Sequence, residues 1–259
     1  MIANYHTHTP RCHHATGAER EYIETAIAAG IQTLGFSDHT PMLFSGGYYS
    51  TMRMYPDETA GYFETLLALR EEYRRDIQIL IGFETEYYPA LFADYLHFLS
   101  QFPVQYLILG QHFLGNEIGY PYVAQETDRE EDLRLYVRQC SQALDTGRFT
   151  YFAHPDVLNF VGSEALYHEQ MTRLCRKALE TETPLELNML GFSADRHYPN
   201  PRFWQIAGEV GCKAVIGCDA HTPAALVDAA AEEACRALAA RSGVSILDTV
   251  PLRNPVFAS

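Results

Sequence analysis

The sequence is poor in basic side chains: 19 Lys and Arg residues stand against 33 Asp and Glu, which leaves a formal net charge of -14 over 259 residues. Proteins that bind nucleic acid need a clustered excess of Lys and Arg to neutralise the phosphate backbone. We therefore expect no nucleic-acid partner. A bound cluster of metal ions would place several positive charges at one point, so the acidic balance still allows a small anionic substrate.

Paired cysteines and long apolar runs are also absent. The six cysteines are Cys12, Cys140, Cys175, Cys212, Cys218 and Cys235. They form no CxxC pair, and the chain enters a polar, histidine-rich segment with no basic-then-apolar leader. Charged or strongly polar residues interrupt every apolar run before it reaches membrane-spanning length. These absences predict reduced thiols, a cytoplasmic location and no membrane partner, and they leave the oligomeric state open.

The pattern of the chain predicts one α/β domain over residues 1–259. Short apolar or β-branched runs alternate with longer amphipathic stretches, as in repeated βα units around a parallel sheet. Strands are predicted at residues 2–8, 33–39, 77–85, 106–112, 150–154, 184–189 and 214–219. Helices are predicted at about 19–30, 57–75, 129–145 and 224–241. Seven such units indicate a barrel one unit short of the eightfold form or an open doubly wound sheet.

The polar residues at the strand ends favour the barrel. They are His6 and His8 on the first strand, His39 on the second, Glu84 on the third, His112 on the fourth, His154 on the fifth, and Asp219 with His221 at the seventh. The carboxyl ends of barrel strands meet at one face, so residues far apart in sequence would converge there. In an H-x-H pair on a strand, both imidazoles point to the same side and can bind one ion.

This ligand set predicts a metal cluster. Histidines with carboxylates suit Zn, Mn or Fe, whereas Ca and Mg prefer oxygen ligands. With His14 the set reaches nine side chains, too many for one ion, and the neighbouring His13 competes with His14 for the same role. We expect two or three divalent transition-metal ions, with Glu84 bridging two of them at about 3.5–4 Å, the spacing of two-metal phosphatases.

Three side chains in loops on the same face are candidate substrate contacts. Arg53 follows the second strand and Arg196 follows the sixth, and a guanidinium can grip two phosphate oxygens at once. Either arginine could instead be only a solvated charge. His197 is the third candidate. Cys218 is expected to point away from the ligands and pack in the core, because side chains alternate along a strand.

Six ordered motifs carry a family resemblance. They are His6-Thr7-His8, Ser37-Asp38-His39, Gly82-Phe83-Glu84, Gly110-Gln111-His112-Phe113, Ala153-His154-Pro155-Asp156 and Gly217-Cys218-Asp219-Ala220-His221. Together they resemble the polymerase and histidinol phosphatase (PHP) superfamily over nearly the whole chain. The chain length, the position of His14 six residues after His8, and the stretch 81–87 look most like the monofunctional histidinol-phosphatase branch.

The resemblance implies a distorted (β/α)7 barrel with a trinuclear centre. The implied ligands are His6, His8, Glu84 and Asp219 for the first ion, Glu84, His112 and His154 for the second, and His14, His39 and His221 for the third. The implied activity is hydrolysis of a small phosphomonoester, L-histidinol phosphate above all, with catalytic roles for Glu84, Asp219 and His221. The chain departs from the family's common pattern at Cys218, where a serine is usual, and at Arg196, which lies later in its loop.

Other activities remain open at this point. A phosphatase of this type could act on another small phosphate or on a phosphotyrosine peptide, and a nuclease-like phosphodiesterase is disfavoured by the acidic charge. Metal-dependent deamination fits less well, because Glu84 and the Asp219-x-His221 ending resemble phosphoester hydrolases. A catalytically silent metal-binding module would be favoured by an incomplete ligand set, and this set looks complete.

Overall fold

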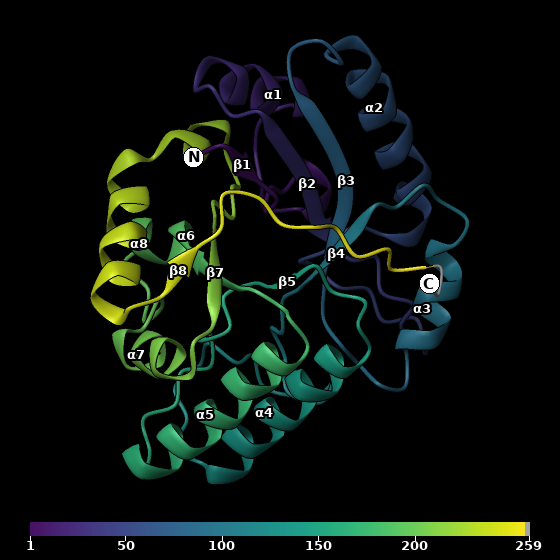
Figure 1. The fold of residues 1–259 in the computed structure, drawn as a ribbon. Helices are drawn as coiled ribbons and strands as arrows, with labels where there is room; N and C mark the ends of the chain where they lie inside the picture. The colour runs from purple at the N-terminus through teal and green to yellow at the C-terminus, as the bar shows by residue number, and fades with distance from the viewer. Residues whose placement is uncertain (257–259) are drawn as a thin grey trace.

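Eight strands pair in the order in which they occur along the chain, and every pair is parallel (Figure 1). The computed structural model describes residues 1–256. The strands are β1 (Ala3–Asn4), β2 (Thr33–His39), β3 (Gln78–Thr85), β4 (Tyr106–Leu109), β5 (Tyr151–Phe152), β6 (Leu185–Asn188), β7 (Lys213–Gly217) and β8 (Ser245–Ile246). Parallel neighbours need crossover connections, and each crossover here contains a helix.

The helices lie where the amphipathic stretches predict them, with additions. They are α1 (Glu19–Ala28), α2 (Thr59–Glu72), α3 (Phe92–Leu99), α4 (Glu130–Asp145), α5 (Glu164–Glu180), α6 (Met189–Ser193), α7 (Pro201–Val210) and α8 (Ala229–Ser242). The predicted helix at 224–241 divides into a 3-10 turn, Pro223–Val227, and α8. The division falls at Asp228, whose carboxylate accepts a hydrogen bond from the backbone N–H of Ala231 and so caps α8.

The sheet closes into a seven-stranded barrel. Beyond β1, Thr7 bridges to Ala220 beyond β7, and the backbone N–H of His8 donates to the Ala220 carbonyl at 2.9 Å. The short β8, which the sequence analysis did not predict, pairs with the first residues of β7 on the same edge. The edge of β7 is therefore shared between β8 at the start and the first strand at the end. This confirms the predicted distorted (β/α)7 barrel.

Packing confines the functional site to one end of the barrel. The interior cluster consists of Ala3, Tyr5, Leu80, Tyr106, Ile108, Tyr151, Ala153, Val215 and Val250. The Tyr106 hydroxyl donates to the carbonyls of Tyr5 and Phe36, and a Cβ at Gly35 would lie only 2.3 Å from that hydroxyl. The segment after β8 crosses the barrel at the amino ends of the strands (Figure 1), where the Val250 N–H donates to the Tyr5 hydroxyl.

The cysteines and the lengths of the helices bear on two further predictions. All six cysteines are free, as predicted, and all six are also buried. The Cys218 thiol lies 3.7 Å from the Met1 sulfur, in the core and not among the predicted ligands. Within residues 1–256, no helix is both long and apolar enough to cross a membrane.

Candidate metal centre

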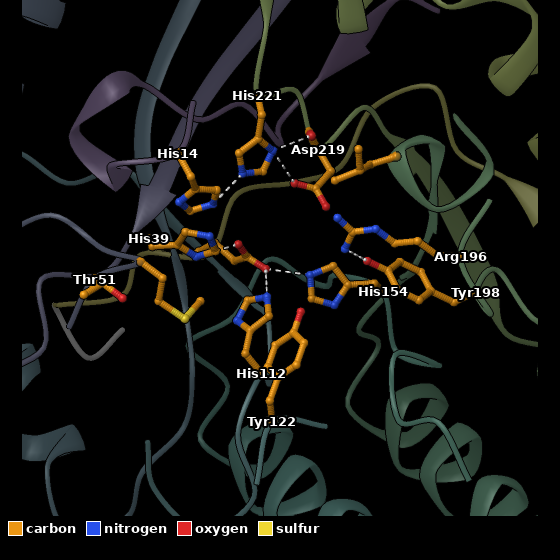
Figure 2. Close-up of a pocket in the computed structure, with 13 residues that line it drawn as sticks. His14, His39, Thr51, His112, Tyr122, His154, Arg196, Tyr198, Asp219 and His221 are labelled. Atoms are coloured by element: carbon orange, nitrogen blue, oxygen red, sulfur yellow. Dashed lines mark hydrogen bonds and ion pairs between the residues drawn. The ribbon is translucent and has the colours of Figure 1, made fainter. Parts of the chain in front are cut away.

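The side chains at the carboxyl ends of the strands line one pocket of about 490 Å³ (Figure 2). The lining residues are His14, His39, Thr51, Met52, Glu84, His112, Tyr122, His154, Leu190, Arg196, Tyr198, Asp219 and His221. The register of the sheet explains part of this convergence, because His39 at the end of β2 pairs directly with Glu84 in β3. Figure 2 shows the labelled histidines pointing inward from opposite sides of the pocket.

Four atoms beneath this pocket frame a position suited to one ion. The Nε2 atom of His6 lies 3.4 Å from Glu84 Oε2 and 3.4 Å from Asp219 Oδ1. The Nε2 atom of His8 lies 3.5 Å and 3.2 Å from the same two oxygens. Four tetrahedral ligands at about 2.0–2.2 Å from a zinc ion lie about 3.3–3.6 Å from one another. The observed separations therefore match the edges of such a tetrahedron.

Unpaired polar atoms support the same position. The Nε2 atoms of His6 and His8 and the Oε2 atom of Glu84 are buried without a hydrogen-bond partner. An unsatisfied buried polar group costs about 1–3 kcal/mol, so three at one point would be costly unless a cation binds there. The donor set fits a divalent transition metal.

Glu84 also faces a second group of ligands. Its other oxygen, Oε1, lies 2.7 Å from His154 Nε2 and 3.3 Å from His112 Nε2. The two oxygens of one carboxylate thus point to two different sets of histidines, which is the arrangement of a bridging ligand. A Cβ at Gly110 would lie 1.9 Å from Glu84 Oε1, so the glycine leaves the space that this carboxylate occupies.

A third group contains His14, His39 and His221, whose ring nitrogens lie within 4.8 Å of one another. The Nε2 atoms of His14 and His221 are 3.0 Å apart. His13, the alternative to His14, has its Nε2 3.8 Å from a carboxylate oxygen of Glu58 and its ring against Tyr55. Of the two neighbours, His14 is the one that joins the cluster.

The protonation of these rings suits metal binding. Burial, reinforced by the nearby His8, lowers the pKa of His39 to about 3 and that of His221 to about 2. Both rings are therefore neutral near pH 7, the form that binds a metal. Against the effect of burial, neighbouring carboxylates raise the pKa of His6 and His8. An ion bound between these two rings and the carboxylates would take the place of such a proton.

Three buried carboxylates that the sequence analysis missed orient the histidines from behind. His6 Nδ1 donates to Glu186 Oε1 at 2.8 Å, His112 Nδ1 donates to Glu86 Oε1 at 2.9 Å, and His8 Nδ1 lies 3.5 Å from Asp38 Oδ1. Such contacts turn the Nε2 atom of each ring toward the metal position. The available signal was a charged residue inside a buried strand, as with Glu186 between Leu185 and Leu187 in β6, a strand for which no ligand was predicted.

The structure contradicts the prediction that Arg53 contacts the substrate. It does not line the pocket, and its side chain is 2% exposed. Its guanidinium pairs with Glu86 and Glu117 and donates to the Thr40 carbonyl. Because these contacts occupy all five N–H donors, none is left for a phosphate.

The other two candidate substrate contacts differ from each other. Arg196 lines the pocket and is its one permanent cation among the residues described; one of its Nη atoms donates to the Tyr198 hydroxyl at 2.8 Å. His197 does not line the pocket, and its Nε2 lies 2.7 Å from the Val157 carbonyl oxygen. The position of Arg196 thus agrees with a substrate contact, whereas the prediction for His197 does not fit the structure.

Comparison with known proteins identifies the family to which this chain belongs. The profile of the PHP domain matches residues 4–190, most of the chain. The chain belongs to the PHP domain family. Asp219 and His221 lie beyond the matched range. Their position beside the other candidate ligands is therefore an observation on the structure of this PHP chain and does not follow from the family match.

Several relatives of this PHP chain are histidinol-phosphatases by name. A probable histidinol-phosphatase from Deinococcus radiodurans is 28% identical over 229 residues, 86% of this chain and 87% of that protein. A histidinol-phosphatase from Bacillus subtilis is 29% identical over 122 residues, 44% of this chain and 45% of that protein.

Solved structures show the same PHP fold. A histidinol phosphate phosphatase from Lactococcus lactis, complexed with zinc, L-histidinol and phosphate, has a TM-score of 0.74 at 21% identity and covers 96% of this chain and 98% of its own. A putative histidinol phosphatase from Listeria monocytogenes has a TM-score of 0.74 at 20% identity, with 89% and 99% covered. At these identities the likeness concerns the fold.

Proposed function

We propose that this PHP protein is a metal-dependent phosphomonoesterase that hydrolyses L-histidinol phosphate to L-histidinol and phosphate. The observation that carries the proposal is Glu84, whose two oxygens face two separate histidine groups directly below an open pocket. The names of the curated relatives support the substrate.

The proposed ligands fall into three groups. They are His6, His8, Glu84 and Asp219 for one ion, Glu84, His112 and His154 for a second, and His14, His39 and His221 for a third. Zn, Mn or Fe suits this mixture of imidazole and carboxylate. Ions bound there would supply the positive charge that activates water for attack and neutralises the phosphate oxygens.

The chain's own side chains have separate roles in this proposal. Arg196 binds a non-bridging phosphate oxygen with the donors that Tyr198 leaves free. Asp219 lies in the lining of the pocket, and its Oδ1 is 3.4 Å from His6 Nε2 and 3.2 Å from His8 Nε2. A protonated group beside Asp219 would supply the proton that the departing alkoxide takes up. The rings of Tyr122 and Tyr198 flank the organic part of the substrate.

The test is phosphate release by protein loaded with Zn²⁺ or Mn²⁺. L-histidinol phosphate is compared with a panel of phosphomonoesters, a phosphotyrosine peptide and one phosphodiester. We expect a strong preference for L-histidinol phosphate that Glu84→Ala abolishes and that Glu233→Ala, a change at an exposed carboxylate, leaves intact. Equal turnover of all monoesters would refute the substrate, and absence of metal-dependent turnover on every compound would refute the enzyme.

A further inference from the structure

Arg53 connects two loops of the pocket to one histidine of the metal centre. Its Nη1 and Nη2 atoms donate to the two oxygens of Glu86 at 2.9 Å each, which is a bidentate ion pair. Its Nε and Nη2 atoms donate to Glu117 Oε2 at 3.0 and 2.6 Å. The remaining donor reaches the Thr40 carbonyl at 3.2 Å, at the end of β2.

Each carboxylate that Arg53 holds has a further partner. Glu86 Oε1 accepts from His112 Nδ1 at 2.9 Å, which directs His112 Nε2 toward Glu84, 3.3 Å away. Glu117 Oε1 accepts from the Tyr48 hydroxyl at 3.0 Å. One guanidinium therefore links a predicted metal ligand on one side with a surface loop on the other.

The two loops involved both contribute to the pocket. Thr51 and Met52, immediately before Arg53, line it from the loop after β2. His112 and Tyr122 line it from the loop after β4, and Glu117 lies between them in sequence. The second loop turns back on itself, since Phe113 bridges to Tyr122. Figure 2 shows Thr51 on one side of the pocket and Tyr122 below it.

We propose that Arg53 is a positioning residue that orients His112 for metal binding through Glu86 and holds both loops around the substrate through Glu117. The part that concerns substrate rests on the proposed phosphatase function. Arg53 itself touches neither metal nor substrate. Its contribution is geometric, because a planar guanidinium can hold two carboxylates at set angles at the same time.

A lysine at this position would keep the charge and lose the geometry. An ammonium has three donors on a single nitrogen, so it cannot give a bidentate pair to Glu86 and still reach Glu117 and Thr40. The two buried carboxylates would then lack part of their hydrogen bonding. Loss of a group that orients a metal-binding histidine typically lowers metal affinity about 10–100-fold.

The first experiment measures Zn²⁺ affinity by chelator competition on the full chain. We expect Arg53→Lys to lower the affinity of the weakened site about 10-fold and Arg53→Met to lower it further, with the circular dichroism spectrum retained. Arg20→Met is the matched control, because Arg20 makes a bidentate pair with Glu72 on the surface, and it should bind Zn²⁺ as the wild type does. Wild-type Zn²⁺ affinity in Arg53→Lys would overturn the proposal, and so would a lowered melting temperature with unchanged affinity.

The second experiment separates the loops from the histidine. Glu117→Ala removes the loop contact and leaves the pairing of Arg53 with Glu86, so Zn²⁺ affinity should stay near wild type while inorganic phosphate binds several-fold more weakly to the metal-loaded protein. Glu117→Gln should restore phosphate binding, because its oxygen can still accept from Arg53. Wild-type phosphate affinity in Glu117→Ala would overturn the loop half. Neither readout uses histidinol phosphate, so a failure of the proposed substrate would be seen separately.

Discussion

Replacing Glu186 by glutamine tests whether the carboxylates behind the histidines decide metal affinity. Glu186 is buried and accepts from four donors: His6 Nδ1 at 2.8 Å and the Tyr151 hydroxyl at 3.2 Å on one oxygen, and the His154 N–H at 3.1 Å and Asn188 Nδ2 at 2.9 Å on the other. A Cβ at Gly217 would lie 1.9 Å from its Oε1, so the side chain is closely enclosed. Glutamine has the same shape, but one of its two ends is a donor.

Both orientations of that amide are unfavourable, the first for the packing around it and the second for metal binding. With its NH₂ group toward His154 and Asn188, two donors face donors, and each unsatisfied buried group costs about 1–3 kcal/mol. With its NH₂ group toward His6, it donates to Nδ1 and leaves the ring proton on Nε2. That atom is the one 3.4 Å from Glu84 Oε2 and Asp219 Oδ1, and a protonated nitrogen cannot bind a metal.

We therefore expect Glu186→Gln to weaken Zn²⁺ binding about 10–100-fold, equivalent to about 1.4–2.8 kcal/mol. Chelator competition measures the affinity, and phosphate release at rising Zn²⁺ concentration shows whether excess metal restores turnover. Glu233→Gln makes the same chemical change at an exposed carboxylate and should have no effect. Zn²⁺ affinity within twofold of wild type in Glu186→Gln would refute the reasoning, because it would mean that the tautomer of His6 does not depend on Glu186.

Three further results are expected. Removing metal with a chelator should lower the melting temperature by about 5–10 °C in scanning calorimetry. The reason is that an ion present at 100 times its dissociation constant stabilises the folded protein by about 2.7 kcal/mol. An unchanged melting temperature would count against a metal centre. Arg196→Met should raise KM for the phosphomonoester and leave Zn²⁺ affinity unaltered, and the reverse pattern would contradict its proposed phosphate contact. His14→Ala should lose one metal equivalent by elemental analysis while His13→Ala keeps the wild-type content, and equal losses would remove His14 from the ligand set.

The strands show how far pattern alone predicts the fold. β2 has the predicted bounds, 33–39, because its seven residues are all buried and pair over their whole length with β3. The fifth strand, predicted at 150–154, is reduced to Tyr151–Phe152. His154 there has a φ of +32°, so the chain leaves the ladder as it enters the pocket. Apolar runs thus predict which segments are strands, but ladder hydrogen bonds end where neighbouring strands and loops dictate.

The candidate site also has a part that the sequence predicts and a part that it does not. Side-chain alternation and the common face of a barrel are general consequences of parallel sheets, so the sequence was sufficient to bring the strand-end histidines and carboxylates together. Loop side chains follow no such rule. Arg53 and Arg196 look alike in the sequence, yet one is buried in ion pairs and the other lines the pocket.

By itself, the sequence determined the seven βα units, the residues at the strand ends and hence a barrel with a metal-binding pocket. Only the tertiary structure decided that His14 and not His13 joins the cluster, and that Glu186, Glu86 and Asp38 lie behind the ligand rings. The physical reason is that these contacts join residues that are far apart in the sequence. Arg53 meets carboxylates 33 and 64 residues away, and Glu186 meets a ring 180 residues away, so local pattern carries no record of these partners.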